Sequence, residues 1–134
     1  MDARKYLAEL IGTFILVAVG SLSIAAAVAM QVPVLIVVPF GFGLGLLAAI
    51  QTAGHVSGGH FNPAVTLGAL LDRRIEPMNA LGYWVAQVVG AIAASGVVLF
   101  VAGQDAVNAT ASGFPDGRMG QAIVVEAILT AIFL

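Results

Sequence analysis

The sequence predicts an all-α membrane protein, and three observations support this fold class. Of the 134 residues, 60% are hydrophobic and only 9% are charged, whereas roughly a quarter of the residues in an ordinary soluble domain are charged. The apolar residues form runs of the length that a helix needs to cross a bilayer, about 20 residues. Sixteen glycines lie among them, and small residues allow transmembrane helices to approach each other closely.

The predicted helices follow the apolar runs in order. Three complete spans are expected at about residues 6–30, 34–53 and 78–102. A polar, glycine-bearing loop at 103–117 precedes a fourth apolar run at 119–134. From Gln121 to Leu134 this run has room for only about 21 Å of helix, less than the roughly 30 Å of hydrocarbon in a bilayer. We therefore expect one domain over 1–134 that is truncated within its fourth span.

The basic residues predict the orientation of these spans. Arg4 and Lys5 precede the first span, Arg73 and Arg74 lie between the second and third, and Arg118 falls in the opposite loop. Because Lys and Arg in short loops stay in the cytoplasm, we expect a multi-pass protein of the cell membrane with a cytoplasmic N-terminus. A cleaved signal peptide is the alternative for the first run, but this run is longer than the apolar part of a signal peptide.

The segment at 54–71 is too short and too polar at its front to be a span. Asn62 is a good N-cap, and Pro63 suits the first helical position. A helix over 63–71 is about 14 Å long, half the hydrocarbon thickness. We therefore expect a re-entrant half-helix that enters from the cytoplasmic side, with its N-terminus near the bilayer midplane.

Non-helical backbone at that depth is tolerated only where it faces protein or a watery cavity. Two glycines in the segment allow extended or left-handed backbone, with carbonyl groups turned toward such a cavity. A pore explains this arrangement economically. Its expected hydrogen-bond acceptors are the carbonyl groups of Gly58, Gly59, His60 and Phe61.

This segment resembles the first signature loop of the aquaporins, the major intrinsic protein family, with Asn62-Pro63-Ala64 at its centre. Similarity extends along nearly all of the chain but over only about half of a family member, which has two inverted repeats. The resemblance implies an aquaporin-like right-handed helix bundle and a homotetramer. It rests on the stretches 8–14, 55–68 and 83–91, and on Glu126 with Thr130.

A passive water channel is the function that the resemblance implies. The Asn62 side chain would donate its amide N–H to a passing water molecule, and the backbone carbonyls would accept. The positive end of the half-helix would repel protons and cations. Phe42, twenty residues before Asn62, corresponds to a selectivity-filter position and matches the water-selective branch. Because the other filter residues belong to the second repeat, a facilitator of glycerol or another small neutral solute stays an alternative.

Two acids lie within apolar runs, where a carboxylate is costly. By resemblance, Glu9 and Glu126 brace the signature loops from behind, and we expect the ring nitrogens of His55 and His60 to bond neighbouring backbone. A proton relay is the alternative for the acids, but the sequence shows no chain of titratable neighbours. The two histidines lack a third ligand nearby, so we expect no metal site.

Other function classes fit the sequence less well. A net charge of −2 and scattered basic residues argue against nucleic acid as a partner, and the partners we expect are water, small neutral solutes and lipid. No nucleophile, base and orienting group occur together, so we expect neither an enzyme nor a cofactor. An energised transporter would show more intramembrane acids. A non-conducting membrane fragment that lacks the second repeat is the remaining alternative.

Overall fold

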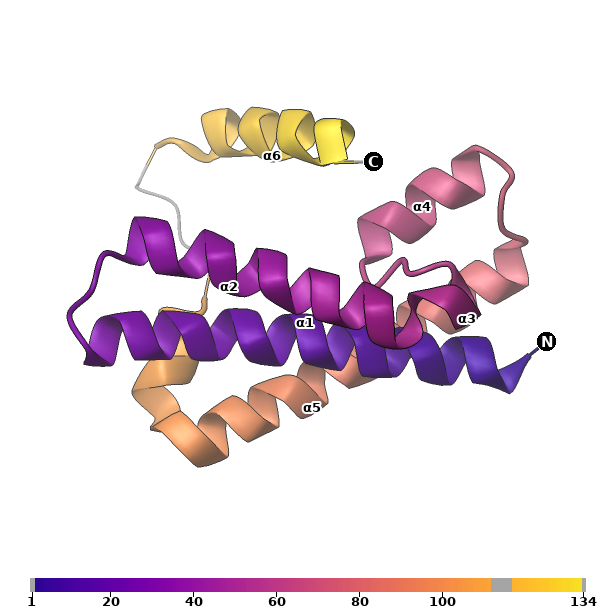
Figure 1. The fold of residues 1–134 in the computed structure, drawn as a ribbon. Helices are drawn as coiled ribbons and strands as arrows, with labels where there is room; N and C mark the ends of the chain where they lie inside the picture. Colours follow the sequence, from indigo (N-terminus) through magenta and orange to yellow (C-terminus); the bar gives the residue numbers. More distant parts are fainter. Residues whose placement is uncertain (1, 112–116, 134) are drawn as a thin grey trace.

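The computed structural model describes residues 2–111 and 117–133, and the elements in this part of the chain are all helical (Figure 1). This confirms the predicted all-α fold class. In chain order the elements are α1 (Ala3–Ala29), α2 (Val34–Ala49), the π-helical segment η1 (Ile50–Gly54), α3 (His55–Ser57), α4 (Pro63–Leu71), α5 (Pro77–Ala109) and α6 (Met119–Phe133).

The centre of the fold is α1, which packs against α2 on one side and α5 on another (Figure 1). The short helices α3 and α4 lie at the end of the bundle that also holds the N-terminus, where α3 contacts α1 and α4 contacts α5. The helix α6 stands apart from this core and packs extensively against none of the other described helices. The long helices therefore form a three-helix platform that supports α4.

Glycines bring the helices of this platform into close contact. A Cβ atom at Gly90 of α5 would lie 2.4 Å from the carbonyl oxygen of Leu10 on α1. On the other side of α1, a Cβ at Gly41 of α2 would come within 2.3 Å of the Ser23 side chain. No side chain larger than hydrogen fits at either place, so these two glycines allow α2 and α5 to approach α1.

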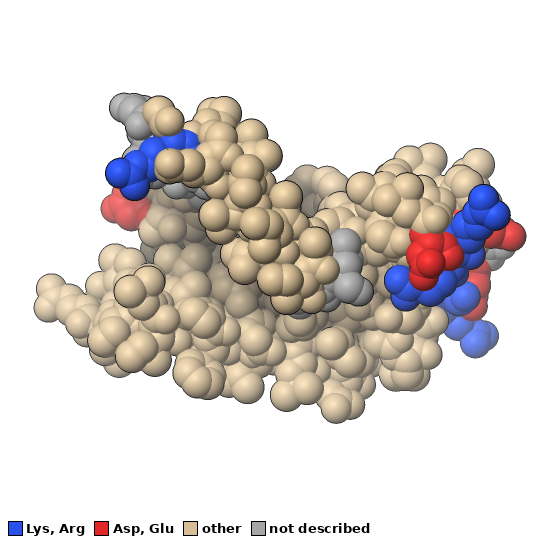
Figure 2. Space-filling view, turned by 90° about the horizontal axis from the view of Figure 1, so that it is seen from above, with Lys and Arg blue, Asp and Glu red and all other residues tan. Residues whose placement is uncertain are grey.

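The described residues include three helical stretches that are long and apolar enough to span a membrane, at Ala3–Ala29, Val34–Ser57 and Pro77–Ala109. Figure 2 shows that the Lys, Arg, Asp and Glu side chains of the visible face gather at the two ends of the molecule, with an uncharged surface between them. This distribution is the one expected of helices that cross a hydrocarbon layer, because charges are costly within it.

The second helical stretch differs from the expected one at its end. It does not stop near Ala53 but continues through η1 and α3 to Ser57, so that only residues 58–62 are non-helical before α4. The wider π turn accommodates an extra residue without leaving the helical path. The Gly58 amide then donates to the Gly54 carbonyl at 2.9 Å and closes the last turn.

The loop expected from Gly103 onward also differs, because α5 continues to Ala109 across a kink. Gly103 has φ 82° and ψ 178°, a conformation that glycine adopts easily. Beyond it the helix resumes, and the side chains of Gln104 and Asn108 are hydrogen-bonded at 3.1 Å, one turn apart. The expected loop residues 112–116, and Leu134 of the fourth apolar run, lie outside the described residues.

Substitution of Gly90 should separate α1 from α5. Because the added methyl group of Gly90→Ala would meet backbone rather than a flexible side chain, we expect the free energy of unfolding to fall by about 1–3 kcal/mol. Gly96→Ala is the matched control on the same helix, since nothing lies within 4 Å of its added Cβ, and it should be neutral or slightly stabilising. Thermal unfolding in detergent measures both, and equal stability of the two variants would contradict the close contact.

Candidate functional site

The non-helical backbone before α4 makes a sharp turn, and we call residues 57–64 the elbow. Gly58 and Gly59 have φ values of 94° and 71°, in the left-handed region that glycine tolerates. Phe61 also has a positive φ, 47°, which is uncommon for a bulky side chain and costs roughly 1–2 kcal/mol. A backbone of this shape persists only where its surroundings hold it firmly.

The carboxylate of Glu9 on α1 holds the elbow from behind. Glu9 is fully buried, and its Oε1 accepts from the Ser57 hydroxyl at 2.6 Å and from the His60 amide at 3.0 Å. Its Oε2 accepts from the Phe61 amide at 2.7 Å and from Nε2 of Gln87 at 2.8 Å. Both carboxylate oxygens are therefore bonded twice, and two backbone N–H groups that no helix can satisfy have a partner.

A second set of contacts joins the elbow to the first turn of α4. The hydroxyl oxygen of Thr66 lies 3.0 Å from Nδ1 of His60, accepts from Nε2 of Gln87 at 2.9 Å and donates to the Asn62 carbonyl at 3.2 Å. Gln87 is 1% exposed and Thr66 is fully buried. Through these two side chains, α5 holds α4 and the elbow as one unit.

Two aromatic residues of α5 donate hydrogen bonds to carbonyl groups on either side of the turn. The hydroxyl of Tyr83 donates to the Ser57 carbonyl at 2.7 Å, and the indole Nε1 of Trp84 donates to the Pro63 carbonyl at 3.1 Å. The His60 ring meets the Tyr83 ring edge-on, with centroids 5.1 Å apart. Each end of the elbow is thus bonded to α5.

Phe61 anchors the elbow to α1 by packing. Its side chain is 1% exposed, and a Cβ added at Gly12 would come within 2.1 Å of its ring. The ring therefore occupies the space that a side chain on α1 would otherwise fill. This packing and the Glu9 hydrogen bond fix the same residue from two directions, which explains how it keeps a positive φ.

Asn62 caps α4 as predicted and keeps its donor group unused. Its Oδ1 accepts from the Ala64 amide at 2.7 Å. The side-chain oxygen must face that amide because the other amide atom of Asn62 cannot accept a hydrogen bond. The side-chain NH2 then points elsewhere, and it donates to no atom of the described residues. Asn62 is half-buried, so a small polar molecule can reach its side-chain NH2 group.

The four carbonyls of Gly58, Gly59, His60 and Phe61 also lack partners. Among the described residues no donor bonds to any of them, although the flanking carbonyls of Ser57 and Asn62 are bonded. In a trans peptide the N–H of one residue and the C=O of the residue before it point in opposite directions. Because the amides of His60 and Phe61 point at Glu9, the carbonyls of Gly59 and His60 point away from it.

Three other residues singled out in the sequence lie outside this network. Phe42 on α2 is 37% exposed, and a Cβ added at Gly20 would come within 2.3 Å of its ring. The His55 side chain is exposed, and no hydrogen bond joins its ring to the part of the chain that the structure describes. Glu126 is exposed on α6, which packs extensively against none of the other described helices. Among the described residues, no side-chain hydrogen bond joins His55 or Glu126 to the elbow. The His60 ring bonds the Thr66 side chain rather than the expected backbone.

Sequence reasoning gave no role to five residues that hold the elbow. Ser57 and Thr66 were part of the signature run, and the polar residue Gln87 lies in an otherwise apolar span, which is a signal that it serves a buried contact. Tyr83 and Trp84 carried no such signal, because aromatic residues are ordinary in an apolar helix.

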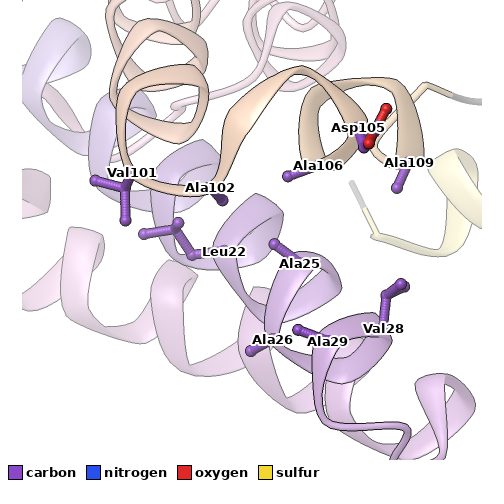
Figure 3. A pocket seen from close by; sticks show the side chains of 10 residues that line it. All are labelled: Leu22, Ala25, Ala26, Val28, Ala29, Val101, Ala102, Asp105, Ala106 and Ala109. Carbon is purple, nitrogen blue, oxygen red and sulfur yellow. The ribbon is translucent and has the colours of Figure 1, made fainter.

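A cavity lies away from the elbow. It has a volume of about 600 Å³ and lies between the C-terminal part of α1 and the kinked end of α5 (Figure 3). Alanines make up most of its lining, and Asp105 is its one charged residue. Within the described residues, no three His, Asp or Glu side chains are grouped as metal ligands would be. The candidate site is therefore the elbow with its unpaired donors and acceptors.

Removal of the Glu9 carboxylate should affect folding before it affects selectivity. Glu9→Gln keeps the shape of the side chain but turns one acceptor oxygen into a donor that faces other donors, and we expect a loss of about 3 kcal/mol in stability. Glu9→Ala should reduce the yield of monodisperse protein on size-exclusion chromatography still further. Glu76→Gln, at an exposed position, is the control. Intact assembly of Glu9→Ala with increased proton leakage in vesicles would contradict this role.

Comparison of the sequence with known proteins identifies the family of this chain. A family model described as major intrinsic protein matches residues 1–134. The chain is 42% identical to aquaporin Z of Photorhabdus laumondii, covering 98% of this chain and 62% of that protein. It is 41% identical to glycerol uptake facilitator protein-like 6 of Lactiplantibacillus plantarum (98% and 60%) and 37% identical to nodulin-26 of Glycine max (95% and 47%). The chain spans about 60% of the first two relatives, and it belongs to the major intrinsic protein family.

Proposed function

We propose that the chain supplies the elbow and half-helix of a passive membrane channel that conducts water. The observation that carries this proposal is the run of four unpartnered carbonyls beside the free amide group of Asn62. The amides of Gly58, Gly59, His60, Phe61 and Ala64, by contrast, are bonded within the protein. A strip of unpartnered acceptors with one free donor at its end suits molecules that both donate and accept, as water does.

The proposed mechanism is an exchange of hydrogen bonds. Water leaving its bulk shell would donate to the carbonyls between Gly58 and Phe61 and accept from the Asn62 amide at the end of the strip. The N-terminus of α4 carries a partial positive charge, so it would repel cations and protons and orient the water dipole. No covalent bond is made or broken, which makes the chain a channel rather than an enzyme.

Water is the favoured permeant, and glycerol or another small neutral solute is the second candidate. The relatives include one named an aquaporin and one named a glycerol uptake facilitator, so similarity alone does not choose between them. Phe42 favours water, because a bulky ring at a filter position narrows the passage for a solute larger than water. The non-conducting fragment is the outcome that a permeability measurement would reveal.

The proposal is tested by stopped-flow light scattering on proteoliposomes that hold the full-length protein. Water selectivity predicts fast osmotic shrinkage with slow glycerol re-swelling, whereas rapid re-swelling would assign the second candidate. Shrinkage at the rate of empty liposomes would contradict a channel of either kind.

Asn62→Asp separates the capping role of Asn62 from its donor role. The carboxylate can still accept from the Ala64 amide and is stabilised by the helix N-terminus, so the unfolding temperature should not fall. Its ionised side chain has no N–H to offer, and we expect water permeability to drop roughly fivefold to tenfold. Asn79→Asp, whose Oδ1 accepts from Tyr6 outside the elbow, is the matched control. Unchanged permeability of Asn62→Asp would remove the donor from the mechanism.

The proposed orientation places the N-terminus in the cytoplasm, and a homotetramer is proposed from the family resemblance. Because this chain contains no cysteine, single cysteines can report its topology. We expect Glu76→Cys to react with a membrane-impermeant maleimide only after the cells are opened, and Gly117→Cys to react on intact cells. The reverse pattern would invert the orientation.

A further inference from the structure

We propose that Trp84 is a positioning residue of the channel, one that sets where the half-helix begins relative to the carbonyl strip. It acts through the Pro63 carbonyl, to which its indole Nε1 donates at 3.1 Å. This inference rests on the proposed function, because the position of the strip matters only if water passes along it. The bond to Pro63 would fix one end of the strip.

The first argument is the pattern of bonded and free carbonyls. Two adjacent residues of α5 donate hydrogen bonds to these carbonyls: Tyr83 to that of Ser57 and Trp84 to that of Pro63. Between these two points lie the four free carbonyls, followed by that of Asn62, which Thr66 bonds. The helix α5 therefore bonds the carbonyls at the two ends of the elbow and leaves the strip between them open to a permeant.

The second argument is the depth of the indole. Trp84 is the only tryptophan of this chain and follows the start of α5 at Pro77 by seven residues, or about 10 Å along the helix. Tryptophan in membrane proteins is enriched at the interface with water, where its N–H finds partners. Deeper in the membrane an indole N–H without a hydrogen-bond acceptor is costly. Here the Pro63 carbonyl, at the start of α4, accepts this hydrogen bond.

The third argument is that the elbow backbone depends on its contacts. Gly58, Gly59 and Phe61 all have positive φ values, so the elbow keeps its shape only while its contacts hold it. Glu9 fixes the amides of His60 and Phe61, but it does not touch Pro63. Gln87 still holds Thr66 in the first turn of α4, so loss of the Trp84 contact would leave the fold intact. It would free the Pro63 carbonyl and let Asn62 shift slightly against the strip.

The test removes the indole N–H without changing the shape of the side chain. In the full-length protein, Trp84 is replaced by β-(3-benzothienyl)alanine, in which sulfur stands in place of the N–H, and in parallel by phenylalanine (W84F). We expect the unfolding temperature of the benzothienyl protein to stay near that of the parent. We expect its water permeability per channel to fall about threefold or more, with a changed ratio of water to glycerol permeability.

A matched control and a spectroscopic measurement keep the result interpretable. Tyr6→Phe removes a hydrogen bond of similar length, 2.9 Å from the Tyr6 hydroxyl to Asn79, between α1 and α5, and should leave permeability unchanged. The indole 15N–1H resonance of Trp84 is identified by its loss in W84F. In the parent protein we expect its chemical shift to be changed by the hydrogen bond to Pro63, and its proton to exchange slowly with water.

The outcomes separate this inference from the proposed function. A conducting parent whose benzothienyl form has the same permeability and the same solute ratio overturns the role of Trp84 and leaves the channel in place. A parent protein that does not conduct overturns both. If W84F alone fails to fold, the benzothienyl protein still decides the question.

Discussion

The elbow depends on a carboxylate that the membrane would otherwise disfavour. Backbone that leaves a helix inside a bilayer must find partners within the protein, because lipid offers none. Glu9 provides them for the amides of His60 and Phe61 and is itself compensated by Ser57 and Gln87. A buried charge without such donors would cost several kcal/mol. The acid and the irregular backbone therefore need each other, because each satisfies polar groups of the other that are buried from solvent.

The same contacts give the elbow two different faces. Since the N–H and C=O groups of a peptide unit point in opposite directions, directing the amides toward α1 directs the carbonyls away from it. The α5 contacts at Ser57 and Pro63 then limit how many carbonyls stay free. The outward direction of the Gly59 and His60 carbonyls is thus a geometric result of bonding the amides of His60 and Phe61 to Glu9.

The features of the elbow and its helices that could be predicted are those fixed by residues close together in the sequence. The dipeptide Asn62-Pro63 fixes the start of α4 through capping and proline chemistry, and the predicted helix over 63–71 has the bounds that the structure shows. The positive φ of Phe61 has no local signal, because it is imposed by Glu9, 52 residues away in the sequence. Gly103 was read as the start of a loop, since a glycine that kinks a helix looks the same in sequence as one that ends it. The partners of Gln87 depend on the rotation of α5 about its axis, which composition does not reveal.

The π-helical segment η1 has a consequence for the direction in which the residues after it face. A π turn holds about one residue more than an α turn, and one residue of an α-helix corresponds to a rotation of about 100°. Residues after Gly54 therefore face directions that a regular helix continued from α2 would not give them. A regular helical wheel drawn over the whole stretch from Val34 to Ser57 would therefore misplace Ser57 by about 100° relative to Glu9, the acid that its hydroxyl contacts.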